Sequence, residues 1–164
     1  MKVLFTYRTL TGNTKKVIDA MHDEIQVEKE LKPWSETESL EGYDLIFVGF
    51  PIEQMGPGPA AKEWLAKNVE GRRIAIVITH GSPEDTVPLQ GWLQQCRDAA
   101  KGAEIVGFFH CRGDMSEALI EGMIQSGNPQ FVEWGQRAKE APRGFPDANA
   151  LKRAREFAND VINQ

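Results

Sequence analysis

Apolar and polar residues follow two different patterns along this chain. Short runs that are almost wholly apolar, such as Asp44–Phe50 and Arg73–Thr79, are typical of strands buried on both faces of a sheet. Longer runs repeat an apolar residue every three or four positions, which is typical of helices that bury one face. The two kinds of run follow one another along most of the chain, and this alternation predicts a parallel sheet.

The short runs predict five strands, of which the second is charged and is expected at an edge of the sheet. They cover Lys2–Tyr7, 26–31, Asp44–Phe50, Arg73–Thr79 and Glu104–His110. The longer runs predict helices over Asn13–Ile25, Ala60–Val69, Leu89–Ala100 and Asp147–Ile162, with residues 115–145 mainly helical. The chain shows no internal repeat, low-complexity tract or linker, so we expect one domain over residues 1–164.

Right-handed crossovers between such elements favour an α/β three-layer sandwich with helices on both faces. The expected sheet is parallel and doubly wound, with the strand order 2-1-3-4-5. Ligands of these sheets bind beyond the carboxyl ends of the strands, where the strand order reverses. That place lies between the first and third strands, so the turns that follow the strands are the candidate site.

The turn after the first strand, here called the first loop (residues 9–14), is dense in hydrogen-bonding groups. Its sequence is Thr9-Leu10-Thr11-Gly12-Asn13-Thr14, which holds three threonines and an asparagine at the start of the first predicted helix. A helix start offers free N–H groups and a positive dipole end, and Gly12 permits close backbone approach, so the loop predicts a phosphate site. Simple helix capping by Asn13 or Thr11 is the alternative. The loop lacks the lysine of a Walker loop and the three-glycine spacing of a dinucleotide fingerprint, which favours a mononucleotide.

The stretch Tyr7-Arg8-Thr9-Leu10-Thr11-Gly12-Asn13-Thr14 resembles the phosphate loop of the flavodoxin family, and its final Thr-Gly-Asn-Thr matches fully. Arg8 and Leu10 replace residues that are usually small or polar there. The resemblance implies a flavodoxin-like fold and non-covalent FMN. It places the phosphate on Thr9, Thr11, Asn13 and Thr14, with backbone N–H groups of Leu10 and Gly12.

The second loop (residues 51–59) follows the third strand and is rich in glycine and proline. The segment from Tyr43 to Leu65 resembles the family stretch that ends a strand and covers the flavin, which implies that the ring is framed by Pro51, Ile52, Glu53, Gln54, Met55 and Gly56. Many relatives carry an aromatic residue there, and this loop has none. Ile52 or Met55 is then the side chain that covers the ring. Glu53 either opposes reduction of the ring to an anion or is a solvated loop carboxylate.

The third loop (residues 79–85) follows the fourth strand. In the resembled family this loop borders the pyrimidine end of the ring, which implies contacts from Thr79, His80, Gly81 and Ser82. His80 is either a protonated group that stabilises a reduced anion or a histidine hydrogen-bonded at a loop edge. Arg112, after the fifth strand, reaches a substrate or partner or forms a surface salt bridge.

Composition limits the partners and the compartment. The 164 residues carry a net charge of -5, which argues against non-specific nucleic-acid binding, because that binding needs a basic surface. No apolar run is long enough to span a bilayer and no leader pattern opens the chain, so we expect no membrane insertion and a cytoplasmic protein. Cys96 and Cys111 form no motif and are expected to be buried thiols. A redox partner protein is expected, with the chain a monomer or a weak homodimer.

Three functions remain open. The first is an FMN-binding electron carrier that passes electrons between redox partners. The second is an FMN-dependent reductase of a quinone or another small conjugated acceptor, with NAD(P)H or a partner as donor, since an uncovered ring face admits a substrate. The third is an interaction module without cofactor, which the intact first loop argues against.

Phe131, Trp134 and Phe145 are expected in ordinary core packing, with a pocket wall or partner surface as the alternative. The chain lacks the acidic cluster of a receiver domain and the Gly-x-Ser-x-Gly elbow of a hydrolase.

Overall fold

A five-stranded parallel sheet forms the centre of the molecule. The computed structural model describes residues 1–164, and its strand order is β2-β1-β3-β4-β5. The strands are β1 (Lys2–Tyr7), β2 (Glu28–Pro33), β3 (Leu45–Pro51), β4 (Arg73–His80) and β5 (Glu104–Arg112). The predicted fold class and strand order are therefore confirmed. The edge strand β2 lies two residues later than the predicted 26–31, a shift typical of a charged segment without apolar alternation.

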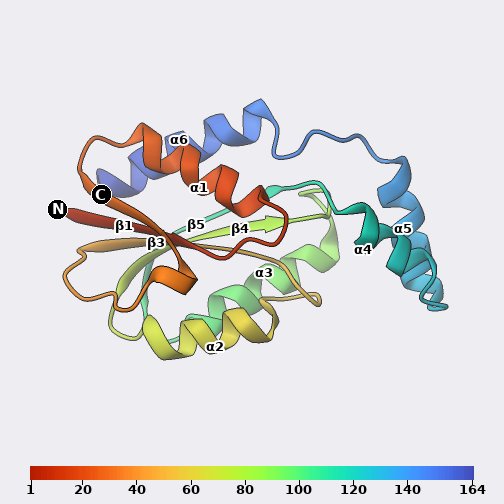
Figure 1. The fold of residues 1–164 in the computed structure, drawn as a ribbon, viewed down its shortest axis with the longest axis horizontal. Helices are drawn as coiled ribbons and strands as arrows, with labels where there is room; N and C mark the ends of the chain where they lie inside the picture. Colours follow the sequence, from red (N-terminus) through yellow and green to blue (C-terminus); the bar gives the residue numbers. More distant parts are fainter.

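Helices cover both faces of the sheet and make it the middle of three layers (Figure 1). They are α1 (Asn13–Glu24), the short 3-10 turn η1 (Trp34–Glu36), α2 (Gly58–Asn68), α3 (Val87–Ala99), α4 (Glu117–Ile124), α5 (Pro129–Glu140) and α6 (Ala148–Ile162). Figure 1 shows α1 and α6 side by side on one face and α2 with α3 on the other. None of these helices has the length and apolar character that crossing a bilayer requires.

The core on the α1 and α6 side explains how the first loop is held in place. Phe5 of β1 and Phe47 of β3 stack with their ring centroids 4.5 Å apart beneath α1. Next to them, a Cβ on Gly49 of β3 would lie 2.8 Å from the Ile18 side chain and 3.0 Å from the Thr14 side chain. Gly49 therefore leaves the space in which the first turns of α1 pack closely on the sheet.

The core on the α2 and α3 side is built from the alternate residues of the same strands. Ile46, Val48 and Phe50 of β3 are fully buried there against Leu65 of α2 and neighbours from α3. Cys96 lies in this layer and Cys111 in the other, and both are buried free thiols, as expected. Burial raises the pKa of each thiol to about 12, so both are inert at neutral pH.

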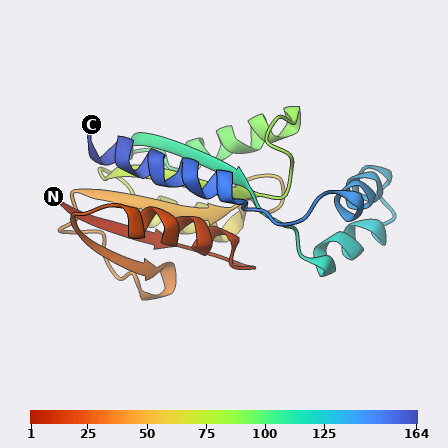
Figure 2. The same cartoon turned by 90° about the horizontal axis from the view of Figure 1, so that it is seen from above.

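The helices α4 and α5 form a hairpin that stands out from the body of the molecule beyond the carboxyl ends of the strands (Figures 1 and 2). Gly135 of α5 lets the two helices approach, because a Cβ there would lie 2.9 Å from Ile124. The expected core packing of Phe131 and Trp134 is wrong, since neither residue belongs to a core of the sheet. They pack against each other, and Trp134 meets Trp92 of α3 edge to face at 6.0 Å. The apolar face of α5 therefore packs against a side chain of α3 and not against the sheet.

Candidate functional site

Three loops meet at the carboxyl edge of the sheet, where the strand order reverses. The first loop follows β1, the second follows β3 and the third follows β4, which is the neighbour of β3. In Figure 1 all of them lie at the end of the sheet opposite the two chain termini. The parallel strands thus bring together the sequence-predicted residues 9–14, 51–56 and 79–82 at one place.

The first loop ends in an open helix start. Gly12, the residue that precedes α1, has a φ of 93°, and no side chain caps the helix. Its N–H donates to Thr9 Oγ1 at 3.0 Å, and its carbonyl accepts from the Lys16 amide at 3.0 Å. The other backbone N–H groups of the loop and first turn donate to no acceptor in the chain. They belong to Thr9, Leu10, Thr11, Asn13, Thr14 and Lys15.

The helices α2 and α3, which follow the second and third loops, also begin without a side-chain cap, whereas the three later helices are capped. Ser116, Asn128 and Asp147 each cap their helix, α4, α5 and α6, by accepting hydrogen bonds from backbone amides of the first turn. The simple-capping alternative for the first loop therefore does not hold, because neither Asn13 nor Thr11 caps α1. A set of free amides at a positive helix end fits an anion with several acceptor oxygens, and the phosphate of a mononucleotide is such a group.

Two side chains of the first loop join it to its surroundings. Thr14 is buried, and its Oγ1 lies 2.7 Å from Thr79 Oγ1 of the third loop. Asn13 Nδ2 donates to the carbonyl oxygen of Asp114 at 2.9 Å. Both side chains therefore already have partners within the chain, whereas the Thr11 side chain makes no hydrogen bond and lies exposed.

The second loop is a tight hairpin turn with a strained tip. Glu53 and Gly56 exchange two backbone hydrogen bonds of 2.8 and 3.2 Å. The two residues between them, Gln54 and Met55, have φ values of 54° and 61°, a conformation that favours glycine or asparagine. Met55 is 44% exposed at this tip. Backbone strain of this kind persists where the surrounding structure holds it, and it concentrates at functional sites.

An ion pair ties the first and second loops together. Arg8 Nε lies 3.2 Å from Glu53 Oε2, and Arg8 Nη2 approaches Glu53 Oε1 at 3.5 Å. Both side chains are partly buried, at 33% and 22% exposed. Both sequence-based alternatives for Glu53 are therefore wrong. The side chain is neither a solvated carboxylate nor an unpaired negative charge. Arg8, one of the two residues that depart from the resembled motif, neutralises the Glu53 carboxylate.

The third loop contains the histidine singled out from the sequence. His80 is only 4% exposed, and its ring nitrogens lie 2.8 Å from the Ser82 carbonyl and 3.0 Å from His110 Nδ1. Burial and then the neighbouring His110 lower the pKa of His80 to about 4. The side chain is therefore neutral at pH 7, which agrees with a hydrogen-bonded histidine and not with a protonated one.

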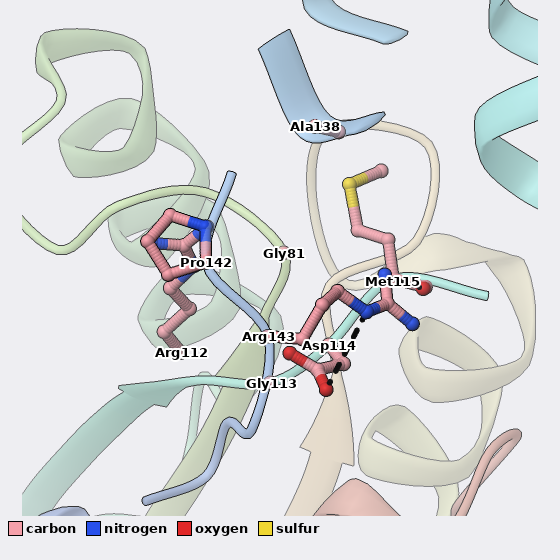
Figure 3. A pocket seen from close by; sticks show the side chains of 8 residues that line it. All are labelled: Gly81, Arg112, Gly113, Asp114, Met115, Ala138, Pro142 and Arg143. Atoms are coloured by element: carbon pink, nitrogen blue, oxygen red, sulfur yellow. Dashed lines mark hydrogen bonds and ion pairs between the residues drawn. The ribbon is translucent and has the colours of Figure 1, made fainter. Parts of the chain in front are cut away.

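A segment that sequence reasoning did not assign to the site closes one side of it. The Asp114 carboxylate accepts hydrogen bonds from the Gly144 and Phe145 amides and lies 3.8 Å from Arg143 Nε. Figure 3 shows Arg143 turned toward Asp114, and both residues line a small cavity of about 10 Å³. Met115 packs directly on Gly81 of the third loop, in the place that a Cβ would fill. The partners of Asp114 lie about 30 residues away in the chain, so no local sequence pattern predicts these contacts.

Arg112 does not form the surface salt bridge that was one of its expected roles. Its guanidinium lies over the Phe145 ring, 4.5 Å from the centroid, and no carboxylate comes within ion-pairing distance of it. A cation over an aromatic face is a stabilising contact. Phe145, expected in the core, is therefore a support for this arginine.

Comparison with known families identifies the family of this chain. The flavodoxin domain family matches residues 4–159. The chain belongs to the flavodoxin domain family. The match spans the sheet and all three loops, and the family resemblance inferred from residues 7–14 is thereby confirmed.

Relatives of known name or structure are also flavodoxin-like. The flavodoxin-like domain-containing protein BilS of Clostridioides difficile (strain CD3) is 29% identical over 99% of this chain and 97% of its own length. A solved flavodoxin from Streptococcus pneumoniae TIGR4 is 13% identical, covers 99% of both chains and superposes with a TM-score of 0.63. A flavoprotein from Lactobacillus acidophilus NCFM, solved in complex with FMN, is 18% identical, covers 66% of this chain and 92% of its own, and has a TM-score of 0.54. The structural likenesses establish the flavodoxin fold.

Proposed function

We propose that this flavodoxin-like protein binds FMN non-covalently and carries electrons between redox partners. One observation carries the proposal: the first loop and first turn of α1 present six backbone N–H groups that no acceptor in the chain uses, beside a glycine with a φ of 93°. A phosphate dianion supplies the acceptors that such a cradle lacks. When bound, FMN supplies the electron-accepting and electron-donating chemistry, and the protein sets the conditions around it.

The residues at the edge of the sheet have separate tasks in this proposal. The amides of residues 9–11 and 13–15, with the exposed Thr11 hydroxyl, hold the phosphate. Ile52 and Met55 of the second loop lie against the ring, and the Gly81 and Ser82 amides of the third loop meet its polar edge. The Arg8–Glu53 pair keeps the wall of the site electrically neutral. Met55 takes the place of the aromatic cover through a softer and more polarisable contact.

The distribution of apolar side chains favours a carrier. Apart from Met1, the exposed large apolar residues lie on segments that leave the carboxyl edge: Leu10 (58%), Met55 (44%), Val87 (84%) and Leu119 (53%). Apolar side chains around an exposed cofactor edge suit brief contact with a second protein. Thr14, His80 and Glu53 are engaged with Thr79, His110 and Arg8, so none of these three side chains stands ready for acid–base catalysis.

The test begins with cofactor binding and then separates a carrier from an enzyme. We expect the purified chain to bind FMN with a characteristic visible spectrum, and to bind riboflavin much more weakly because riboflavin lacks the phosphate. We expect little turnover with NAD(P)H and quinones alone, and rapid reduction once a flavodoxin reductase is added. Equal affinity for FMN and riboflavin would contradict the phosphate assignment.

A reductase of a small conjugated acceptor is the second candidate, and one observation favours it. The second loop has no aromatic side chain over the ring site, so one ring face remains open to a flat substrate. The same steady-state assay distinguishes the two functions. Turnover of a quinone with NAD(P)H and no added protein supports the reductase.

A further inference from the structure

The buried His80 and the half-buried His110 form a pair behind the third loop. His80 ends β4, and His110 comes from the neighbouring strand β5. Their facing nitrogens, His80 Nε2 and His110 Nδ1, are 3.0 Å apart, and the rings are tilted by 40° with centroids at 5.2 Å. The other nitrogen of His80, Nδ1, lies 2.8 Å from the Ser82 carbonyl oxygen. The histidine pair is therefore hydrogen-bonded, through His80, to the backbone of the third loop.

The hydrogen-bond network assigns the proton positions in this pair. A carbonyl oxygen only accepts, so His80 Nδ1 carries a proton and donates it to Ser82. A neutral imidazole has one N–H, which leaves His80 Nε2 as an acceptor. His110 Nδ1 must then be protonated and donate to it. The donors point in one direction, from His110 through His80 to the third loop.

The pair tolerates one positive charge but not two. A proton on His110 Nε2 leaves both hydrogen bonds intact, because Nδ1 still donates. A second proton, on His80 Nε2, places two N–H groups face to face at 3.0 Å with no lone pair between them. Two neighbouring cations then also repel each other. The second charge therefore breaks the His80–His110 contact and frees His80 to turn.

The surroundings keep both imidazoles neutral near pH 7. Burial, then His110, lowers the pKa of His80 to about 4, and burial lowers the pKa of His110. The charged groups that face the pair come from every side: Glu84 from the third loop, Arg97 from α3, Arg112 from β5 and Arg153 from α6. Glu84 is itself paired with Arg153 at 2.9 Å, which shares its negative charge.

The third loop, which the histidine pair holds, has unused backbone N–H groups. The amides of Gly81 and Ser82 donate to no acceptor in the chain, although the Gly81 backbone is packed beneath Met115. The His80–Ser82 hydrogen bond turns the Ser82 carbonyl inward, so this part of the backbone has a fixed direction. We propose that His80 and His110 are positioning residues for the cofactor: they hold the Gly81–Ser82 turn in the arrangement that offers its two amides to a flavin ring, and they release it when both imidazoles are charged. This inference rests on the proposed flavin site.

The test measures riboflavin and FMN binding to the full chain by quenching of flavin fluorescence. Riboflavin reports the ring contacts alone, since it has no phosphate. We expect His80→Leu to weaken binding of both flavins by about tenfold, because the Ser82 carbonyl loses its donor. The matched variant His80→Asn keeps an N–H at the position of Nδ1 and should restore affinity to within about twofold. A role in packing alone would not show this rescue.

A pH series adds a readout that does not depend on the His80→Leu variant being folded. The wild-type affinity for riboflavin should fall as the pH approaches 4, where His80 titrates, while circular dichroism shows the chain still folded. The uncharged amide of His110→Asn can present either its N–H or its oxygen to His80, so the contact survives protonation of His80 and the affinity should not change over this range. In the wild type without flavin, imidazole ¹⁵N NMR should find His80 and His110 both protonated at Nδ1.

The outcomes separate this inference from the proposed function. If His80→Leu binds riboflavin as the wild type does while FMN binding persists, the positioning role is wrong and the flavin site stands. An equal loss of affinity at low pH in His110→Asn would also overturn it. If the wild type binds neither flavin, the proposed function fails and this inference fails with it.

Discussion

Arg8 and Glu53 stand 45 positions apart in the chain and meet across the candidate site, with Arg8 Nε 3.2 Å from Glu53 Oε2. The pair joins the first loop to the second, so the phosphate end and the ring end of the site share one connection. Each charge also cancels the other beside the position proposed for the ring. The reduction potential of a bound flavin is therefore expected to depend on both residues.

Removal of either partner should shift that potential in opposite directions. Arg8→Gln leaves the Glu53 carboxylate uncompensated and should lower the midpoint potential of bound FMN, because negative charge opposes electron uptake. Glu53→Gln leaves the guanidinium and should raise it. A partly exposed pair is worth about 1 kcal/mol, which corresponds to about 20 mV for a two-electron couple. Spectroelectrochemical titration measures the shift.

The double variant Arg8→Gln/Glu53→Gln is the matched control, because it restores neutrality without the ion pair. Its potential should return close to that of the wild type. A double variant that keeps the shift of one single variant would contradict the electrostatic explanation.

Gly12→Ala should weaken FMN binding by about tenfold or more. A φ of 93° strains any residue with a Cβ, and relaxing it turns the free amides of the first loop away from a common point. Gly71→Ala is the control, since Gly71 also has a positive φ of 69° and open space around it, but it precedes β4 at the opposite edge of the sheet. Both variants should lose about 1–2 kcal/mol of unfolding free energy in urea. Only Gly12→Ala should lose affinity; equal losses would exclude a local role.

Thr14→Val should affect both stability and binding. It leaves the buried Thr79 hydroxyl without its partner at 2.7 Å, which costs about 1–2 kcal/mol of unfolding free energy. It also loosens the contact between the first and third loops, so FMN affinity should fall by about tenfold. Thr14→Ser keeps the hydroxyl and should bind FMN nearly as the wild type does. Urea unfolding and fluorescence titration measure the two effects, and unchanged affinity in Thr14→Val would remove this hydroxyl from the site.

Asp114→Asn should reduce stability in a pH-dependent way. Burial alone would raise the pKa of Asp114, but the Gly144 and Phe145 amides and the Arg143 guanidinium outweigh it and hold the pKa below its ordinary value. The ionised carboxylate therefore stabilises the folded state fully above the unfolded pKa of about 4, and this contribution disappears as the pH falls through the folded value. With a side chain 27% exposed and screened by solvent, the loss at pH 7 should be about 1 kcal/mol. Urea unfolding at pH 7 and pH 3 should show the difference shrinking; a constant difference would contradict the assignment.

The order of the elements was predictable because a buried strand or helix face requires apolar residues at regular positions in its own segment. Strands β3 and β4 are covered on both faces, so nearly every residue from Leu45 to Phe50 and from Ile74 to Ile78 is apolar. Strand β2 lies at an edge with half-exposed residues, and its position was therefore placed less accurately. Helix α2 begins at Gly58, two residues earlier than predicted, because Pro59 is compatible with a first helical turn.

The site was predictable in its composition and not in its connections. Glycine and hydroxyl residues in the first loop indicated an open helix start, since these residue types serve that purpose locally. The partners of Asn13 and Thr14 lie 101 and 65 residues away, and no local pattern encodes such pairings. The second loop departs from the usual residue preference of tight turns. Gln54 and Met55 occupy left-handed backbone positions that favour glycine. Only the packing of the whole chain imposes that turn.

With FMN bound as proposed, the uncapped start of α1 makes the stability of the fold depend on the supply of flavin. A ligand that completes the helix end adds its binding free energy to the folded state and to no other, so the loaded chain resists unfolding more than the unloaded chain. Where flavin is scarce, the unloaded protein exposes its first helical turn to exchange and proteolysis sooner than the rest. Cellular abundance of this protein is then expected to follow flavin supply.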